Sequence, residues 1–212
     1  MPTRQARGSY PKGAARREQI VRTALDVFAT EGFERTALKH VAELVGIREA
    51  TMFHYFRGKQ ELLTAVLEER DNRSQGLVND GSLLAALPEV AEVNSTQPGL
   101  TTLYAVASAT ANDPSHDAHP FFQERYVELV ETLAGDIRGG QAQGRVRGDL
   151  PAETLARLVI AVFDGLQLQW LYDKRVDMAG GLRALTGVLF VSDESAQQPN
   201  GARADSGRET NA

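Results

Sequence analysis

The chain has 212 residues, which is enough for one or two domains with a core and a small-molecule cavity. It contains no run of 18 apolar residues, which argues against a membrane span, and no cysteine, which excludes disulfides and thiolate metal sites. The first 19 residues are polar and basic and lack the apolar stretch of a secretory signal, so we expect a cytoplasmic protein.

Charge divides the chain into two unequal parts. The net charge of −5 argues against nonspecific nucleic-acid binding by the chain as a whole. Residues 1–60, however, contain 11 Lys or Arg and 6 Asp or Glu, whereas residues 61–212 contain 12 basic and 22 acidic side chains. A basic N-terminal quarter on an acidic body concentrates the surface that attracts phosphate. A chance excess of arginines on solvated faces would give the same count.

The N-terminal quarter begins with residues 1–13, whose Pro, Gly and basic side chains predict a mobile arm. A helix is predicted from Ala14 until Gly32, with Ile20, Ala24, Val27 and Phe28 on one apolar face.

Residues 38–56 carry the pattern of a helix-turn-helix. Thr36 is expected to cap a helix with Leu38, Val41, Ala42 and Val45 on its apolar side. Gly46 stands where a sharp turn needs a left-handed backbone, and a short helix is predicted over about residues 49–55. In such a motif the second helix enters the major groove of DNA.

The remaining elements are also predicted to be helical. A helix begins near Lys59 and runs toward Arg73, and Asp177 is expected to cap the last helix. Helices are also predicted over residues 83–93, 98–112, 121–143, 151–173 and 178–191. Strand alternation is absent, so the fold class is all-α, with a helix-turn-helix domain over residues 14–60 and a larger helical domain over 61–191. The polar residues 192–212 predict a disordered tail.

A specific combined motif runs from Arg16 to Leu67. It comprises Glu31-Gly32-Phe33, Thr36, Val41-Ala42, Val45-Gly46-Ile47, Thr51-Met52-Phe53-His54-Tyr55-Phe56 and Gly58-Lys59-Gln60-Glu61-Leu62-Leu63. In this spacing the segment resembles the TetR family of bacterial transcriptional regulators. The resemblance implies an N-terminal DNA-binding domain, and a C-terminal domain that forms a homodimer and binds a small-molecule effector.

The resemblance also assigns DNA-contacting positions. Those that match the family's phosphate, groove-edge or base contacts are Thr36, Lys39, Arg48, Glu49, Ala50, Thr51, His54, Tyr55 and Lys59. Glu49 is able to accept from a cytosine amino group, or else pairs with Arg48 or Lys39; Ala50 and Thr51 suit a thymine methyl. Phe53 departs from the family's usual tyrosine, which removes a phenolic donor to phosphate. The alternative for each side chain is plain solvent exposure.

The last two helices are implied to form the dimer interface. Leu182, Leu185, Val188 and Leu189 would supply the apolar stripe, with Gly181 and Gly187 allowing close approach. A two-fold dimer would require a near-palindromic DNA operator. The alternative is that these helices complete the monomer's own core.

Candidates for an effector pocket combine apolar bulk with a few hydrogen-bonding groups, although an aromatic stripe at helical spacing more often belongs to a core than to a cavity. They are Tyr104, Phe122, Tyr126, Phe163, Gln167 and Trp170. His116 and His119, with Asp113 and Asp117 nearby, have weak spacing for a metal site and also suit a helix-capping loop. No cofactor is expected, and no catalytic set of nucleophile, base and orienting group appears, so an enzyme is not expected.

The expected function is a repressor that a small-molecule effector releases from its operator. A DNA-tethered dimeric interaction protein without a pocket remains an alternative, and so does an activator.

Overall fold

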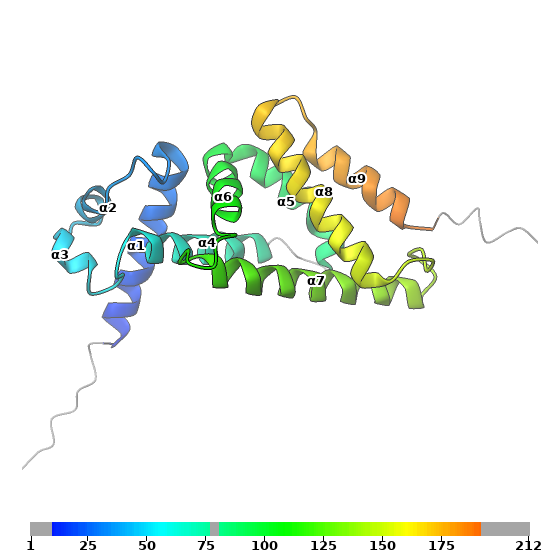
Figure 1. Ribbon diagram of the computed structural model, residues 1–212, viewed down its shortest axis with the longest axis horizontal. Coiled ribbons are helices and arrows are strands. Elements are labelled where there is room, and N and C mark those ends of the chain that lie inside the picture. Colours follow the sequence, from blue (N-terminus) through cyan, green and yellow to red (C-terminus); the bar gives the residue numbers. More distant parts are fainter. Residues whose placement is uncertain (1–9, 77–80, 192–212) are drawn as a thin grey trace, which may run out of the picture.

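The computed structural model describes residues 10–76 and 81–191, and Figure 1 shows that these residues form an assembly of helices. The helices that carry the predicted helix-turn-helix, here called the head, are α1 (Tyr10–Glu31), α2 (Leu38–Val45) and α3 (Glu49–Met52). The helix α4 (Lys59–Gln75) leads from the head into the body. The body consists of α5 (Leu83–Thr96), α6 (Pro98–Thr110), α7 (His119–Ala142), α8 (Ala152–Tyr172) and α9 (Met178–Leu189). The predicted all-α class is confirmed.

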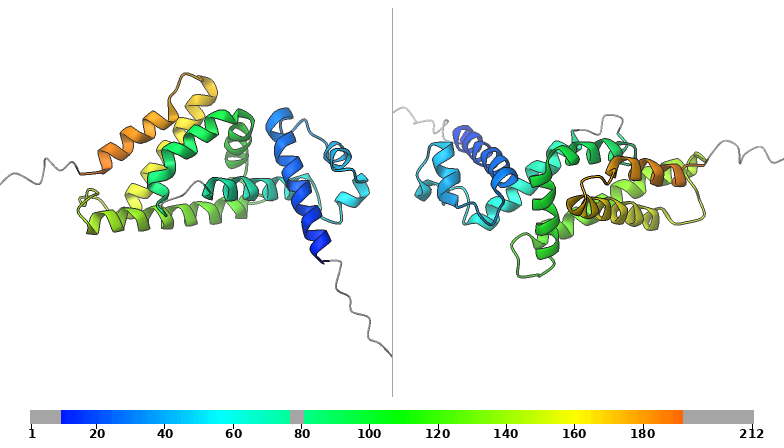
Figure 2. Two further views of the ribbon diagram at one scale, coloured as in Figure 1. Left: turned by 180° about the vertical axis from the view of Figure 1, so that it is seen from behind. Right: turned by 90° about the horizontal axis from the view of Figure 1, so that it is seen from above.

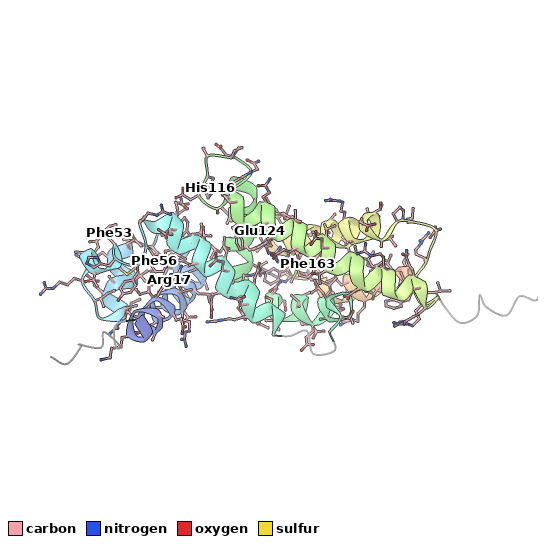
Figure 3. The ribbon with its side chains drawn as sticks, turned by 90° about the horizontal axis from the view of Figure 1, so that it is seen from below. Arg17, Phe53, Phe56, His116, Glu124 and Phe163 are labelled. Atoms are coloured by element: carbon pink, nitrogen blue, oxygen red, sulfur yellow. The ribbon has the colours of Figure 1, made fainter. Side chains whose placement is uncertain are left out.

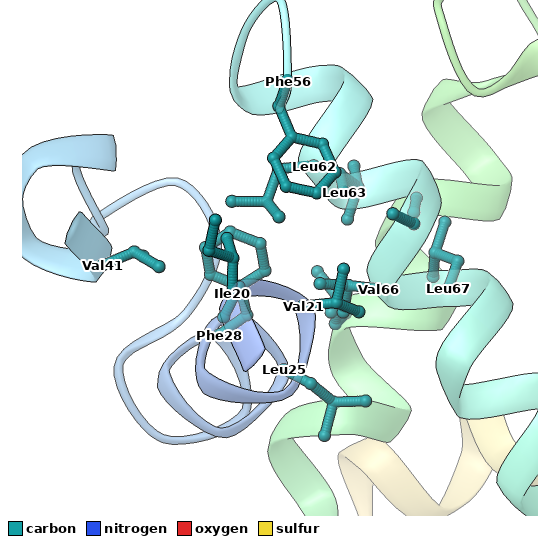
Figure 4. Close-up of a cluster of buried hydrophobic side chains, with 14 of the residues drawn as sticks. Ile20, Val21, Leu25, Phe28, Val41, Phe56, Leu62, Leu63, Val66 and Leu67 are labelled. Carbon is teal, nitrogen blue, oxygen red and sulfur yellow. The ribbon is translucent and has the colours of Figure 1, made fainter. Parts of the chain in front are cut away.

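The head has an apolar core built around the predicted face of α1. Ile20 and Phe28 are buried, and Figure 4 shows them gathered with Val41 of α2 and with Phe56 and Leu62. Fully burying a side chain of this size stabilises a fold by about 1.5–3 kcal/mol, so α1 holds the two short helices in place. The same cluster continues into Leu100, Leu103, Ala107 and Phe122 of the body.

Gly46 makes the turn between α2 and α3. Its φ is 74°, in the left-handed region, as the sequence predicted. The Ile47 amide donates to the Ala42 carbonyl at 2.9 Å and the Gly46 amide donates to Glu43 at 3.1 Å, which together form a Schellman motif. This closure sets the angle at which α3 leaves α2.

Gly99 allows the first turn of α6 to lie against the end of α1. A Cβ atom at Gly99 would lie 1.5 Å from the Ala29 carbonyl oxygen, which is a backbone atom that cannot rotate away. The head and the body therefore meet backbone to backbone at this point.

The body has a second core, shared by α5, α7, α8 and α9. Leu133 and Ile137 of α7 pack there with Leu155 of α8 and Leu182 of α9. Asp136 of α7 accepts from the Leu84 amide at 3.1 Å and so helps to cap α5. Figure 2 shows α9 beside α8, on the side of the body away from the head.

Several predicted boundaries are wrong. The helix α1 begins at Tyr10 rather than Ala14, because a proline such as Pro11 is tolerated in a first helical turn. The recognition helix ends at Met52, and turns continue to Phe56. The last helix ends at Leu189, because Phe190 forms an isolated antiparallel bridge with Val146. Residues 1–9 of the predicted arm and the predicted tail, 192–212, lie outside the described residues.

The predicted cap at Asp177 is confirmed, since its carboxylate accepts from the Gly180 amide at 2.7 Å. Within the part of the chain that the structure describes, no helix is both long and apolar enough to cross a membrane.

Replacing Gly46 tests the turn. We expect Gly46→Ala to lower the free energy of unfolding by about 1 kcal/mol, because alanine is strained at this φ. Gly135→Ala is the matched control: this exposed α7 glycine has open space around its Cβ position, so the same change should stabilise the protein by about 1 kcal/mol. Urea unfolding measures both. If both variants changed the free energy of unfolding in the same direction, the role of Gly46 in the left-handed turn would be contradicted.

Candidate nucleic-acid interface and internal cavity

The outer face of the head carries most of the predicted DNA-contacting side chains. Arg48 precedes α3 at its N-cap in an extended conformation, and it is exposed together with Glu49 and Ala50. Thr51 is half-buried on the same turn, and His54 is exposed just after it. These residues form a continuous stretch of chain that a DNA groove can reach.

Two predicted DNA-contacting residues have other roles in the structure. Thr36 is buried and donates its hydroxyl to the Gly32 carbonyl at 2.9 Å, so it does not present a contact at the surface. The predicted Thr36 cap is also wrong, because α2 has Ala37 at its N-cap. Lys59 Nζ donates to the Glu34 carbonyl at 3.2 Å and lies 4.2 Å from the centre of the Phe33 ring. In this structure the Lys59 ammonium group therefore connects α4 to the loop after α1.

The other predicted positions differ in exposure. Lys39 is exposed, with its Nζ 3.8 Å from Glu43 on the next turn, which is a weak pair. Tyr55 is half-buried against the head core, whereas Phe53 is 53% exposed. A phenyl ring this open to solvent is available for a flat apolar contact in place of the family's phenolic one.

Basic residues early in α1 lie next to the helix-turn-helix, and sequence reasoning did not single them out. Arg16 donates to the Val45 carbonyl at 3.4 Å, and the Arg17 guanidinium lies 4.9 Å from the centre of the Phe56 ring. Figure 3 shows Arg17 beside Phe56 at the head end. The sequence feature that could have indicated them is the pair of adjacent arginines just before the apolar face of α1.

A partly open cavity of about 490 Å³ lies between α4, α5, α6, α7 and α8. Its apolar wall includes Leu87, Val159 and Phe163, and Figure 3 shows Phe163 in the interior of the body. Its polar wall includes Arg70, Asn94 and Tyr104. A volume of this size suits a small organic molecule.

A charged cluster joins α4 to α7 at the cavity wall. Asp71 accepts hydrogen bonds from Arg125 Nε and, at 3.3 Å, from Arg125 Nη2. Arg70 Nη1 donates to the same carboxylate at 3.3 Å, and Arg70 Nη2 donates to Asn94 of α5 at 3.4 Å. Arg70 is only 7% exposed, and this desolvation lowers the pKa of its guanidinium. One carboxylate thus serves two guanidinium groups.

Tyr104 lies between these two arginines. The guanidinium carbons of Arg70 and Arg125 lie 4.5 and 4.7 Å from the centre of its ring. Burial raises the pKa of the Tyr104 hydroxyl far above its usual range. Within the described residues, this buried hydroxyl has no hydrogen-bond partner.

Asp164 of α8 is a further acid at the cavity. Tyr126 donates its hydroxyl to Asp164 Oδ2 at 2.9 Å. Burial raises the pKa of the Asp164 carboxyl, and it also raises the pKa of Tyr126 to about 12. Both groups are therefore less readily ionised than they would be in water.

Three of the six predicted pocket residues line this cavity: Tyr104, Phe163 and Gln167. Phe122 lies behind Tyr104 in the head-side core, with ring centres 5.4 Å apart. Tyr126 touches the site through Asp164, and Trp170 is buried in the body core with Lys174 Nζ 3.3 Å from its ring centre. Sequence reasoning missed Arg70, although it follows Leu63, Val66 and Leu67 at helical spacing on the inner face of α4.

The two histidines of the loop before α7 make local hydrogen bonds. His116 Nδ1 accepts from the Ala118 amide at 3.1 Å, and His119 Nδ1 lies 2.7 Å from the Ala111 carbonyl oxygen. Across the described residues, no group of three or more acidic or histidine side chains is arranged to hold a metal ion.

The predicted dimer stripe lies partly in the monomer's own core. Leu182 and Leu189 are buried there, and a Cβ at Gly181 would lie 2.9 Å from Leu166 of α8 in the same chain. The sequence pattern could not separate the inner from the outer side of an apolar helix. Val188 of the predicted stripe is exposed, and the exposed apolar residues of α8 and α9 are Leu158, Ala161, Leu168, Tyr172, Ala184 and Val188. We call this set the α8–α9 face.

An all-helical protein with a helix-turn-helix head and a cavity-containing body belongs to the class of DNA-binding regulators. A family model described as bacterial regulatory proteins, tetR family, matches residues 20–66. A second model, described as the C-terminal domain of BetI-type transcriptional repressors, matches residues 84–188. The chain belongs to the TetR family of DNA-binding transcriptional regulators. Members of this family bind DNA operators and act as dimers.

Curated relatives extend the match over most of the chain. The HTH-type transcriptional repressor Rv1474c of Mycobacterium tuberculosis is 28% identical over 72% of this chain and 81% of its own length. The HTH-type transcriptional repressor AcnR of Corynebacterium diphtheriae is 25% identical over 86% and 92%.

Solved structures share the fold. A TetR transcription regulator from Haloarcula marismortui has a TM-score of 0.72 at 16% identity, covering 84% of this chain and 100% of that one. A regulator from Saccharomonospora viridis, solved in complex with choline, has a TM-score of 0.68 at 22% identity, with coverage of 84% and 100%.

Replacing Asp71 tests the charged cluster. We expect Asp71→Asn to lower the free energy of unfolding by about 3 kcal/mol, because two largely buried guanidiniums lose their shared counter-charge. Asp173→Asn is the matched control: it removes the same charge from an exposed pair with Arg175 and should leave the stability unchanged. Chemical denaturation compares the two. An equal change in the free energy of unfolding for both variants would mean that the Asp71 cluster contributes no more to stability than an exposed ion pair.

Proposed function

We propose that this protein is a homodimeric repressor that binds a near-palindromic operator and is released from it by a small molecule in the body cavity. The observation that carries this proposal is the position of α4. Leu62 and Val66 of this helix are buried in the head core, whereas Arg70 and Asp71, one turn further on, line the cavity. A helix is stiff over this length, so a change at the cavity reaches the head directly.

The cavity favours a ligand-responsive regulator over an interaction protein without a pocket. A volume of about 490 Å³ lies within the range of small-molecule sites, and its wall combines apolar side chains with a few polar ones. The relatives named as transcriptional repressors support repression over activation. The relative solved with choline supports a small-molecule ligand in a body of this fold.

For the dimer, we propose that the α8–α9 face is the contact surface. Leu158, Leu168 and Tyr172 recur along one side of α8 at helical spacing, and Leu168 is 52% exposed. Val188 of α9 is 65% exposed. A row of exposed apolar side chains at the end of the body is typical of a protein interface. Two-fold pairing would place two heads on successive turns of DNA, about 34–36 Å apart.

For DNA recognition, we propose that Arg48, assisted by Arg16 and Arg17, holds the phosphate backbone and that Thr51 contacts base edges. Arg48 stands exposed at the start of α3 and has no ion-pair partner among the described residues, so it suits a phosphate. Thr51 lies on the same turn with a methyl and a hydroxyl available to the groove.

A gel-shift titration against the DNA flanking the protein's own gene tests the function. We expect a sequence-specific, salt-sensitive complex. Arg48→Ala should weaken binding to all sequences and lower the salt slope by about one, since one phosphate contact is lost. Thr51→Ala should instead reduce discrimination between operator and altered operator by about 1 kcal/mol.

The control is Arg145→Ala, which removes an exposed charge from the loop after α7, at the end of the body opposite α3. It should leave binding unchanged. The absence of any specific complex would refute the function, and a uniform loss in Thr51→Ala would refute the division of roles between Arg48 and Thr51.

Light scattering tests the dimer. We expect Leu168→Glu to yield a monomer, because a buried carboxylate without a partner is costly at an apolar contact. A monomer should also bind the operator much more weakly. Val127→Glu is the control, because Val127 is 54% exposed on α7 outside the α8–α9 face and should remain dimeric. A dimeric Leu168→Glu protein would place the interface elsewhere.

A further inference from the structure

The cavity has more hydrogen-bond donors than its own acceptors can use. Each guanidinium offers five N–H groups, and the partners found among the described residues account for two hydrogen bonds on Arg70 and two on Arg125. Asp71 already serves both arginines and Asn94 Oδ1 accepts from Arg70, whereas Asp164, a further carboxylate at the cavity, accepts from Tyr126.

The Tyr104 hydroxyl adds an unused polar group to this donor set. Tyr104 lines the cavity at 4% exposure, and its hydroxyl has no partner in the described part of the chain. The Tyr126 hydroxyl, on α7, donates its own proton to Asp164. Leaving such a group unpaired costs about 1–3 kcal/mol, which a ligand atom that accepts from it would recover.

The same geometry is unfavourable for an organic cation. Cations bind over aromatic faces, but the Tyr104 ring already has the guanidinium groups of Arg70 and Arg125 stacked against it, 4.5 and 4.7 Å from its centre. Asp164 is protonated more readily than a surface acid, since burial raises its pKa. The other acids of the wall, Glu128 and Glu131, are exposed to water on α7.

We infer that the effector of this protein is a small organic anion whose carboxylate or phosphate binds Arg70, Arg125 and the Tyr104 hydroxyl. Its hydrocarbon part lies against Leu87, Val159 and Phe163. Guanidinium groups match both kinds of anionic oxygen. The inference rests on the proposed function, in which this cavity is the effector site. It assigns this chain a ligand of opposite charge to the choline in its structural relative.

Calorimetry and thermal shift on the full-length protein test the inference with named probes. The carboxylate arm consists of benzoate and the straight-chain mono- and dicarboxylates of four to eight carbons. The phosphate arm consists of glycerol 3-phosphate and phenyl phosphate, and the cation arm of choline and tetraethylammonium. We expect at least one anion to bind with a Kd below about 1 mM, to raise Tm and to release the operator, with no response to either cation. Whichever anionic arm responds identifies the head group. No binding by any anion would overturn the inference.

Two variants separate ligand recognition from folding. Tyr104→Phe should weaken the responding anion about tenfold and leave the ligand-free Tm unchanged or higher, because the hydroxyl has no partner to lose. Asp164→Asn is the control. It keeps the side-chain volume and the oxygen that accepts from Tyr126, so anion affinity should stay the same or rise. If Asp164→Asn lost anion binding while Tyr104→Phe kept its full affinity, the result would contradict an anion held by Tyr104.

Operator binding without ligand is measured first, which separates the two levels of the argument. A specific operator complex that choline releases and the anions do not would leave the proposed function standing and overturn the anion. Without any specific operator complex, the proposed function fails whatever the cavity binds.

Discussion

The carboxylate of Asp71 is the contact on which the connection between cavity and head depends. It accepts from Arg70 on its own helix and from Arg125 on α7, and so it fixes the inner end of α4 against the body. Removing charges from water is costly, and an arrangement of two guanidiniums around one carboxylate leaves one positive charge without a partner. An arrangement of this kind is a poor way to stabilise a fold. It is a good way to make the position of α4 depend on what else enters the cavity.

The head is not an independent unit in this structure, because its core extends into the body. Leu100, Leu103 and Phe122 pack in the same cluster as Ile20 and Phe28, and Gly99 brings α6 against the backbone of α1. Tyr104 belongs to this cluster and also lines the cavity. The head therefore has two links to the cavity, one through the charged end of α4 and one through the packing of α6. In the proposed effector site, a ligand that contacts Arg70 and Tyr104 would act on both.

The parts of the fold that sequence predicted well are those with strong local signals. The apolar face of α1, the left-handed Gly46 and the Asp177 cap each depend on neighbours in the chain, and each was predicted from them. The charged cluster could not be predicted in this way, because Asp71 and Arg125 lie 54 positions apart. The predicted dimer stripe mixed buried with exposed residues for a different reason. Both sides of these helices are apolar, so periodicity alone did not show that Leu182 faces inward and Val188 outward.

The chemistry of the cluster also determines the direction in which a ligand acts. A ligand shifts an equilibrium between two conformations only by the difference in its affinity for them, and a change from 1:99 to 99:1 requires a ratio of roughly 10⁴. In the proposed site the anion uses N–H groups that Asp71 leaves free, and it would bind Arg125 more tightly in a conformation in which α4 has moved and Asp71 has withdrawn. A cation would pair with Asp71, and the arginines would then lose the negative charge of this carboxylate without receiving another. Of the two, only the anion would stabilise a conformation in which α4 is released, because it would give the buried Arg125 guanidinium the counter-charge that Asp71 takes away with α4.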